Sequence, residues 1–362
     1  MRNLLITALA VAMLLSSAAA ARSQPAPGPQ PQEGDYIAHD FHFRSGEALP
    51  ELRLHYTTLG TPRRDAAGHV VNAVMILHGT GGEGHGFIRP EFSGVLFTPG
   101  GLLDPARYYI ILPDGIGHGK SSKPSDVLHA RFPHYDYDDM VEGQYQMLTK
   151  GLGVDHLRLI MGTSMGCMHS FVWGETHPQF MDALMPLACA PTQIAGRNRI
   201  WRKMVIDGIT ADPAWMGGDY KTEPPMALRI AGDFLVIAGS APLYMHKNEP
   251  TRDEADAYLK RVMDSYMAQL DANDMLYAVS ASRNYDPSAD LEKITVPVMW
   301  LNSADDFINP PELGIAEKLA LRLPHGRFIM IPISDQTRGH GTHTMAAVWQ
   351  DHLAELLKES ER

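Results

Sequence analysis

The chain has 362 residues, of which 44% are hydrophobic, and a formal net charge of −11. This length allows a large buried core, and the acidic balance argues against a surface for nucleic acid or anionic lipid. Two cysteines, Cys167 and Cys189, are too few for a disulfide framework. We expect each to be a small buried apolar side chain, with a bridge between them as the lesser alternative.

The N-terminus has the three parts of a secretory signal. A positively charged start precedes an apolar stretch over residues 4–15 and a run of small residues over 16–21. A membrane anchor needs roughly 20 apolar residues, so stable membrane insertion is not expected. We predict a signal peptide over residues 1–21, cleaved after Ala20 or Ala21, and hence a secreted or periplasmic protein.

The ordered domain is expected over residues 35–362, because residues 22–34 are rich in Pro and Gln and indicate a disordered linker. Its first two segments, 36–43 and 52–60, predict a hairpin. Six later apolar runs predict buried strands at 71–79, 108–114, 156–162, 181–189, 296–302 and 327–333. Helical patterns occupy 137–152, 165–177, 312–322 and the segment from 344 onward. This alternation predicts an α/β fold with a mostly parallel sheet covered on both faces.

One interval interrupts the alternation. Residues from about 190 to about 290 have helical patterns and no strong strand signal. We expect a helical cap inserted between two strands of the sheet.

A serine between two glycines follows the strand predicted at 156–162. The order of strand, Gly162-Thr-Ser164-Met-Gly166 and helix is that of a nucleophile elbow. The glycines omit side chains that would collide in so tight a turn, and the helix N-terminus favours a developing negative charge. A serine cap between chance glycines is the alternative, but the strand before and the helix after favour Ser164 as a nucleophile.

An orienting acid is expected between the nucleophile and the base along the chain. Asp305 and Asp306 both follow the strand predicted at 296–302. We favour Asp306, because its spacing to Pro310 is D-x-x-x-P, and Asp305 is the alternative.

His340 is the expected base, since it follows the last strand and precedes the last helix, with His343 as the alternative. A His-x-x-His pair could instead bind a metal. No third cluster of metal ligands accompanies this pair, so we expect no metal.

An oxyanion hole requires two backbone N–H groups. Met165, directly after the nucleophile, supplies one, and Thr80 in the glycine-rich loop after an early strand supplies the other. Residues 79–84 of this loop also match G-x-G-x-x-G, but no helix pattern follows them, so no nucleotide cofactor is expected.

Together, these motifs resemble the α/β-hydrolase superfamily, and finer features resemble its homoserine O-acetyltransferase branch. The likeness runs from about residue 52 to the C-terminus and is carried by S-M-G-C-M at 164–168 and by segments 139–157, 210–220 and 270–286. The resemblance implies an α/β-hydrolase fold and an acyl-enzyme on Ser164. It departs at Asp138 and Ile206, where that branch carries arginines suited to binding a carboxylate.

We therefore predict an exported serine hydrolase of the esterase type that cleaves a small acyl ester. An acyltransferase with the same triad is the alternative; the missing arginines and the export signal count against it, because acetyl-CoA is a cytoplasmic substrate. An inactive binding module of the same fold is a third reading, which the intact elbow, acid and base oppose. No pattern in the sequence indicates an oligomeric state.

Overall fold

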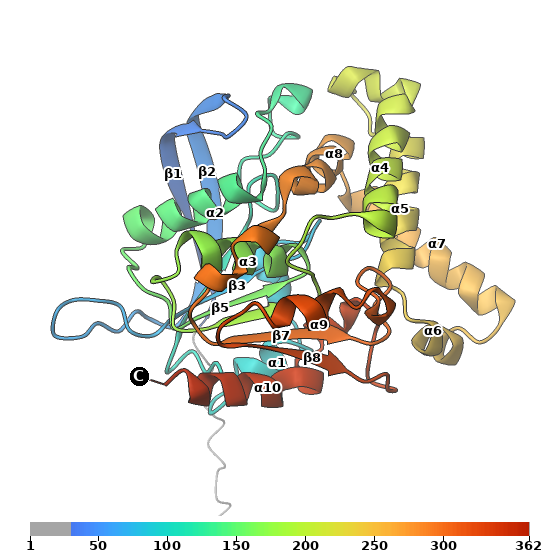
Figure 1. The fold of residues 1–362 in the computed structure, drawn as a ribbon. Coiled ribbons are helices and arrows are strands. Elements are labelled where there is room, and N and C mark those ends of the chain that lie inside the picture. Colours follow the sequence, from blue (N-terminus) through green and yellow to red (C-terminus); the bar gives the residue numbers. More distant parts are fainter. Residues whose placement is uncertain (1–29, 362) are drawn as a thin grey trace, which may run out of the picture.

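A computed structural model describes residues 30–361, which build one eight-stranded sheet with helices on both faces (Figure 1). The predicted signal peptide and most of the predicted linker lie outside these residues. The ordered domain begins earlier than predicted, because the first strand starts at Gln32, inside the segment assigned to the linker.

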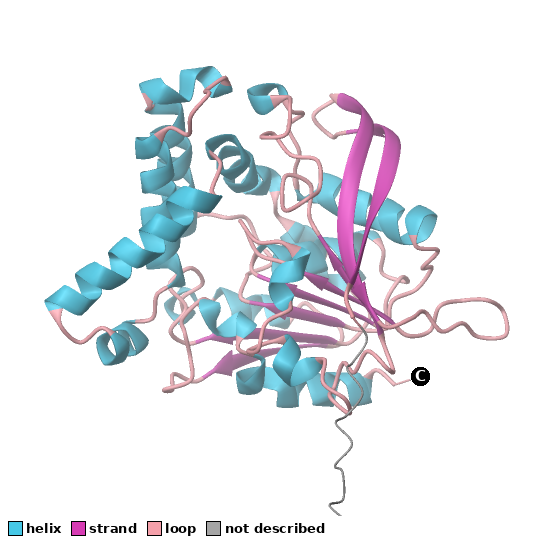
Figure 2. Ribbon diagram, turned by 180° about the vertical axis from the view of Figure 1, so that it is seen from behind, coloured by secondary structure: helices cyan, strands magenta, loops and turns pink. Residues whose placement is uncertain are grey.

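The strands lie in the order β1-β2-β4-β3-β5-β6-β7-β8. Their bounds are β1 Gln32–His42, β2 Ala48–Leu59, β3 Ala73–Leu77, β4 Tyr109–Pro113, β5 Leu159–Thr163, β6 Leu184–Leu187, β7 Val298–Ser303 and β8 Gly326–Ile331. The first two form the predicted hairpin, in which Asp35 pairs with His55, and β2 is antiparallel to β4. The remaining neighbours are parallel. Figure 2 shows the hairpin rising from one edge of the sheet.

The helices divide between the two faces of the sheet and a separate group. Their bounds are α1 Ser93–Leu96, α2 Tyr137–Gln146, α3 Met165–Thr176, α4 Gly196–Ala211, α5 Pro225–Gly239, α6 Pro242–Asn248, α7 Arg252–Gln269, α8 Ala272–Ser280, α9 Ile315–Ala320 and α10 Ala346–Glu359. The segment predicted as a helix at 312–322 is therefore shorter, because Gly314 adopts a left-handed conformation and separates α9 from a 3-10 turn.

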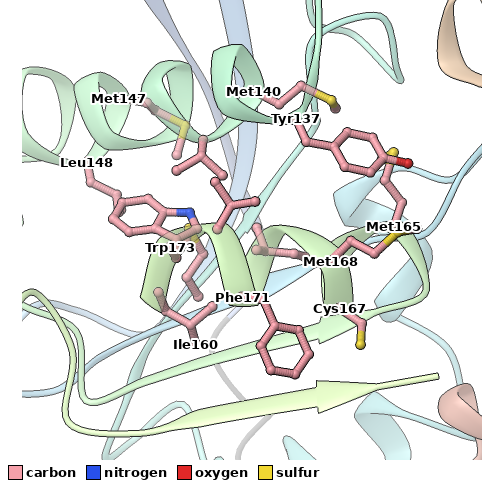
Figure 3. Close-up of a cluster of buried hydrophobic side chains, with 14 of the residues drawn as sticks. Tyr137, Met140, Met147, Leu148, Ile160, Met165, Cys167, Met168, Phe171 and Trp173 are labelled. Atoms are coloured by element: carbon pink, nitrogen blue, oxygen red, sulfur yellow. The ribbon is translucent and has the colours of Figure 1, made fainter. Parts of the chain in front are cut away.

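Two buried clusters hold these layers together. On one face, α2 and α3 pack on the sheet around Phe171 and Trp173, with Met140 and Met147 above them (Figure 3). On the other face, Trp349 of α10 contacts Phe92 at the start of α1. These layers confirm the predicted parallel sheet covered on both faces.

Between β6 and β7, an interval that the structure describes throughout, the chain forms the helices α4 to α8 and no strand. In Figure 1, α4 to α7 stand beside the sheet, and α8 lies above α3. They share a buried cluster of their own around Trp201, Val205, Leu228 and Met275. The cap thus has its own small core and can shape a site at the edge of the sheet.

The expectation for the cysteines is wrong in one respect. Both are buried, as predicted, but Cys167 and Cys189 form a disulfide with their Cα atoms 5.8 Å apart. Cys167 lies in the first turn of α3 and Cys189 lies just after β6. Because β5 and β6 are parallel neighbours, the segments that follow them emerge at the same edge of the sheet, which brings the two thiols together.

Within residues 30–361, no single helix has the length and apolar composition to cross a membrane. The pair α5 and α6, bent by 99°, meets both criteria only when the two helices are taken together.

Candidate active site

Ser164 lies in the tight turn between β5 and α3. Its φ of 54° and ψ of −108° lie in a region that residues with a side chain rarely adopt. The flanking glycines explain how the turn fits. A Cβ on Gly162 would lie 2.0 Å from the carbonyl oxygen of Gly166, and a Cβ on Gly166 would lie 2.2 Å from that of Leu77. The local packing therefore requires glycine at both positions and presents the serine side chain above the sheet.

The structure brings the predicted nucleophile, base and acid into one hydrogen-bonded chain. The Nε2 atom of His340 lies 2.8 Å from the Oγ of Ser164. Its Nδ1 atom lies 2.9 Å from Oδ2 and 3.1 Å from Oδ1 of Asp306. Ser164 follows β5, Asp306 follows β7 and His340 follows β8. The carboxyl ends of these parallel strands lie on the same side of the sheet.

Asp306 is fully buried and held by groups that stabilise its charge. Its Oδ1 accepts the backbone N–H of Ile308 at 2.7 Å, and its Oδ2 accepts the side-chain amide of Asn309 at 3.2 Å. Burial alone would raise the pKa of Asp306, but His340 and these donors together lower the pKa below its ordinary value. Asp306 is therefore suited to remain an anion beside the imidazole.

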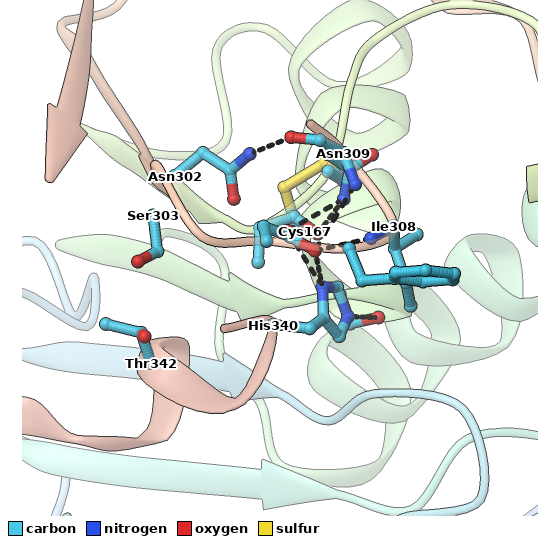
Figure 4. Close-up of polar contacts among 12 residues, drawn as sticks. Cys167, Asn302, Ser303, Ile308, Asn309, His340 and Thr342 are labelled. Carbon is cyan, nitrogen blue, oxygen red and sulfur yellow. Dashed lines mark hydrogen bonds and ion pairs between the residues drawn. A yellow bond between two sulfur atoms is a disulfide. The ribbon is translucent and has the colours of Figure 1, made fainter. Parts of the chain in front are cut away.

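Asn309 is a positioning residue that the sequence did not indicate. Its amide also donates to the carbonyl of Ala188 at 3.1 Å, and its own carbonyl accepts the amide of Asn302 at 2.7 Å (Figure 4). These contacts tie the loop after β7 to the end of β6. An asparagine before two prolines looks like an ordinary turn residue, so only the folded structure reveals this role.

The alternative acid and base stand outside the chain of hydrogen bonds. Asp305 accepts the hydroxyls of Ser303 and Thr337 instead, the latter at 2.9 Å. The ring of His343 meets His340 edge-on with 5.2 Å between ring centres. Burial lowers the pKa of His343 well below its ordinary value, so its imidazole is neutral. Within residues 30–361, no three His, Cys, Asp or Glu side chains lie close enough together to hold a metal.

The glycine-rich loop after β3 lies against Ser164. A Cβ on Gly79 would lie 3.2 Å from the Cβ of Ser164. The Nε2 of His78 accepts the backbone N–H of Gly115 at 2.9 Å, so the proton of this neutral ring is on Nδ1 and donates to the carbonyl of Gly79 at 2.8 Å. Burial lowers the pKa of His78 to about 4, which keeps this tautomer neutral near pH 7.

The hydrogen bond from His78 orients the peptide that joins Gly79 to Thr80. The N–H of Gly82 also donates to the carbonyl of Gly79, at 3.0 Å. In a trans peptide the N–H points opposite to the carbonyl, so the N–H of Thr80 is directed away from His78 and Gly82. The sequence did not indicate His78; its function in orienting the peptide emerges from the structure.

A cavity of about 580 Å³ opens beside Ser164 and His340. Its walls are mostly apolar, and Met168, Trp300 and Phe328 contribute to them. The first helix of the cap, α4, and residues 308–317, which run from the loop after β7 into the start of α9, also line the cavity. Ser164 thus faces a space large enough for a small organic substrate.

Comparisons with known proteins identify the family to which this fold belongs. Residues 72–334 match the family described as the alpha/beta hydrolase fold. A probable acyltransferase of Methanothermobacter thermautotrophicus is 29% identical over 302 residues, which are 83% of this chain and 90% of that protein. A homoserine O-acetyltransferase of Natronomonas pharaonis is 28% identical over 301 residues, which are 70% and 72% of the two chains.

Among solved structures, the acetyl esterase MekB superposes with a TM-score of 0.78 at 21% identity and covers 90% of this chain and 97% of its own. That likeness concerns the fold. The match to the family covers most of the chain and confirms the resemblance seen in the sequence. The elbow, the cap and the family match lead to one conclusion: this chain belongs to the α/β-hydrolase fold family and resembles its homoserine O-acetyltransferase-like enzymes.

Proposed function

We propose that this protein is a serine esterase that cleaves small acyl esters through an acyl-enzyme on Ser164. The observation that carries the proposal is the hydrogen-bonded chain of Ser164, His340 and Asp306 at the wall of a cavity. The enzyme class itself follows from the family, whose members include both esterases and acyltransferases.

In the first half of the reaction, the Oγ of Ser164 attacks the ester carbonyl carbon while its proton passes to Nε2 of His340. Asp306 accepts a hydrogen bond from the Nδ1–H of the imidazolium that forms, and its carboxylate stays ionised. Collapse of the tetrahedral intermediate breaks the bond to the alcohol oxygen, which leaves with the proton from Nε2. The acyl group is then bonded to Ser164.

In the second half, water attacks the acyl carbonyl carbon while its proton passes to Nε2 of His340. Collapse of the second tetrahedral intermediate breaks the bond to the Oγ of Ser164, which takes the proton from Nε2, and the carboxylic acid is released. The N–H groups of Thr80 and Met165 hold the oxyanion in both halves. The orientation of the peptide at Thr80, which His78 sets, supports this assignment. The Thr80 hydroxyl is buried without a partner among the described residues and lies in the same loop, so it is available as a further donor.

Acyl transfer to an alcohol is the second candidate, because the sequence relatives named above are an acyltransferase and a homoserine O-acetyltransferase. A transferase must bind its acceptor well enough to outcompete water at about 55 M, which requires oriented binding. Asp138 and Ile206 stand where that branch carries arginines, so the chain lacks those two carboxylate contacts. This favours water as the acceptor.

The test compares two reactions of the purified mature protein. We expect hydrolysis of p-nitrophenyl acetate and no appreciable release of CoA from acetyl-CoA in the presence of homoserine or serine. Ser164→Ala supplies the blank for both assays. Saturable, acceptor-dependent CoA release that exceeds the rate of hydrolysis would replace the esterase with the transferase and leave the triad unchanged.

We also propose that the protein acts outside the cytoplasm, after removal of residues 1–21. The disulfide between Cys167 and Cys189 supports this location, because disulfides persist in oxidising compartments such as the periplasm and the extracellular space.

A further inference from the structure

Arg202 is a buried cation in the wall of the cavity that contains the nucleophile. It belongs to α4 of the cap, and its side chain is 2% exposed. Ser164, His340 and Arg202 all line the same cavity. An arginine in such a place needs a physical reason, because burying a charge is costly unless the charge is paired.

The partners of Arg202 within the protein are all neutral. Its Nε donates to the amide oxygen of Asn198 at 3.0 Å, and its Nη1 donates to the hydroxyl of Ser282 at 3.2 Å. Its guanidinium carbon lies 4.7 Å from the ring centre of Trp201. The guanidinium also interacts with the hydroxyl of Tyr137, and burial raises the pKa of Tyr137, so this group is uncharged as well.

Among residues 30–361, no carboxylate forms an ion pair with Arg202. The acidic side chains that line the cavity, Glu312 and Glu317, are exposed and belong to the loop after β7 and to α9. Burial lowers the pKa of Arg202, but an arginine stays protonated in a protein. A full positive charge therefore lines the cavity without a counter-charge.

We propose that Arg202 binds a carboxylate of the substrate, so that the ester cleaved at Ser164 is anionic. This inference rests on the proposed esterase function and adds the substrate class. A guanidinium has five N–H donors and can offer two of them in parallel to one carboxylate, so the bonds to Asn198 and Ser282 and the contact with Tyr137 leave donors of Arg202 for that pair. Arg202 does not stand at position 138 or 206, where the resemblance would place arginines, so this contact is a property of this chain.

The remaining walls define the rest of the substrate. Met168, Trp300 and Phe328 are apolar, and the cavity volume is about 580 Å³. We infer a small ester in which a short aliphatic segment joins the reacting carbonyl to a carboxylate. The carboxylate can belong to the acyl group or to the alcohol, and the two cases are distinguished by experiment.

The kinetic test uses two matched pairs of esters. The mono-p-nitrophenyl ester of glutaric acid is compared with p-nitrophenyl pentanoate, and the acetate ester of 4-hydroxybutanoate is compared with butyl acetate. We expect the wild type to prefer the anionic member of one pair, which identifies the part that carries the carboxylate. Arg202→Gln is expected to lower kcat/KM for that ester by about 10- to 100-fold, the range for a lost charge-assisted hydrogen bond, with little change for its neutral counterpart.

Two further variants make the result specific to the charge at this position. Arg202→Lys keeps the charge without the two parallel N–H donors, and we expect it to retain part of the preference for the anionic ester. Lys203 is the next cation of α4, and its exposed side chain forms an ion pair with Asp207. We expect Lys203→Gln to leave the preference for the anionic ester unchanged. Circular dichroism establishes that each variant is folded.

A binding measurement separates failure of this inference from failure of the esterase proposal. We expect glutarate to bind the Ser164→Ala protein in a calorimetric titration, and Arg202→Gln in the same background to weaken that binding about 10-fold or more. If wild-type protein cleaves none of the esters but glutarate binds through Arg202, the esterase proposal fails and the carboxylate site stands. If it cleaves neutral and anionic esters equally and glutarate does not bind, the carboxylate site is excluded and the esterase stands.

Discussion

The backbone of Ser164 is held in a conformation that costs on the order of 1–3 kcal/mol, and the surrounding packing maintains it. The turn places the hydroxyl within 2.8 Å of His340 at the wall of the cavity. A serine that merely capped a helix would not require this strain. The strained turn, the imidazole and the buried carboxylate together explain why this hydroxyl is the one we assign as nucleophile.

The first prediction separates the two candidate acids and the two candidate bases. We expect Asp306→Asn to lower kcat far more than Asp305→Asn, because Asp306 holds the imidazole. His340→Ala is expected to be about as damaging as Ser164→Ala, since members of a triad act as a unit, and His343→Ala far less so. Steady-state kinetics on variants with native circular dichroism spectra provide the measurement, and a reversed order within either pair would contradict the assignment.

The second prediction concerns a carboxylate on α3 that is not part of the site. Burial, with the nearby charges of Asp138 and Asp290, raises the pKa of Glu175 to about 7 from the ordinary 4.5. Between pH 4.5 and about 7, the folded state therefore binds a proton that the unfolded chain has lost. The stabilisation that this proton provides decreases as the pH rises through this range and is absent above it.

We expect Glu175→Gln to raise Tm at pH 8 and to leave it nearly unchanged at pH 4.5. The gain at pH 8 is at most about 1 kcal/mol, because the side chain is only partly buried and solvent screens its charge. Calorimetric melting at the two pH values measures it, with Glu142→Gln on exposed α2 surface as the control. A Tm that is lower than that of the wild type at pH 8 would show that Glu175 stabilises the fold as an anion.

The third prediction concerns the link between α3 and the segment after β6. The disulfide between Cys167 and Cys189 closes a loop with a sequence separation of 22, which corresponds to about 3 kcal/mol by loop closure. We expect a thiol reductant, or the double substitution Cys167→Ala with Cys189→Ala, to lower the free energy of unfolding by this order. Urea denaturation measures the loss.

The chain itself supplies the control for that experiment, because it contains no other cysteine. Reductant is therefore expected to leave the double variant unaffected. Activity is expected to fall with the bridge as well, because Cys167 follows Ser164 by one helical turn and Cys189 lines the cavity. Equal stability of the oxidised and reduced wild-type protein would show that the bridge contributes nothing to the fold.

The sheet could be predicted from the sequence because parallel strands are buried on both faces and appear as continuous apolar runs. β4, for example, is buried at every position and lies inside the predicted run at 108–114. The elbow could be predicted because its glycines are required by the local turn. α9 was predicted too long, because the left-handed Gly314 interrupts a pattern that looks helical along the chain.

Other features could not be predicted because they depend on tertiary packing. Cys167 and Cys189 approach each other only because β5 and β6 are neighbours in the sheet. Arg202 looks like a surface residue near the start of a helix until the cap folds over it and removes it from water. The same holds for Asn309, whose partners come from three different segments.

For the molecule as a whole, the sheet supplies the proposed triad, and the cap supplies the cavity wall that we propose selects the substrate. Arg202 on α4 faces a cavity whose floor is formed by residues at the edge of the sheet. Changes in the cap are therefore expected to alter which ester is cleaved, while changes at the sheet edge alter whether any ester is cleaved.

The fourth prediction concerns the mature chain. We expect the protein to be found outside the cytoplasm, with an N-terminus near Ala21 or Arg22, because residues 1–21 have the pattern of a cleaved signal. N-terminal sequencing of protein recovered from cell fractions provides the measurement. A cytoplasmic chain that retains Met1 would remove the argument from export and restore acetyl-CoA as an available acyl donor.

The central claim is that one serine hydroxyl of the folded protein is a nucleophile. The most direct measurement is treatment of the native protein with a fluorophosphonate probe, followed by peptide mapping of the adduct. We predict a single adduct on Ser164, absent from Ser164→Ala and strongly reduced in His340→Ala, because the hydroxyl is activated only when its base is present. An adduct on another serine, or no adduct on the folded wild-type protein, would contradict the account.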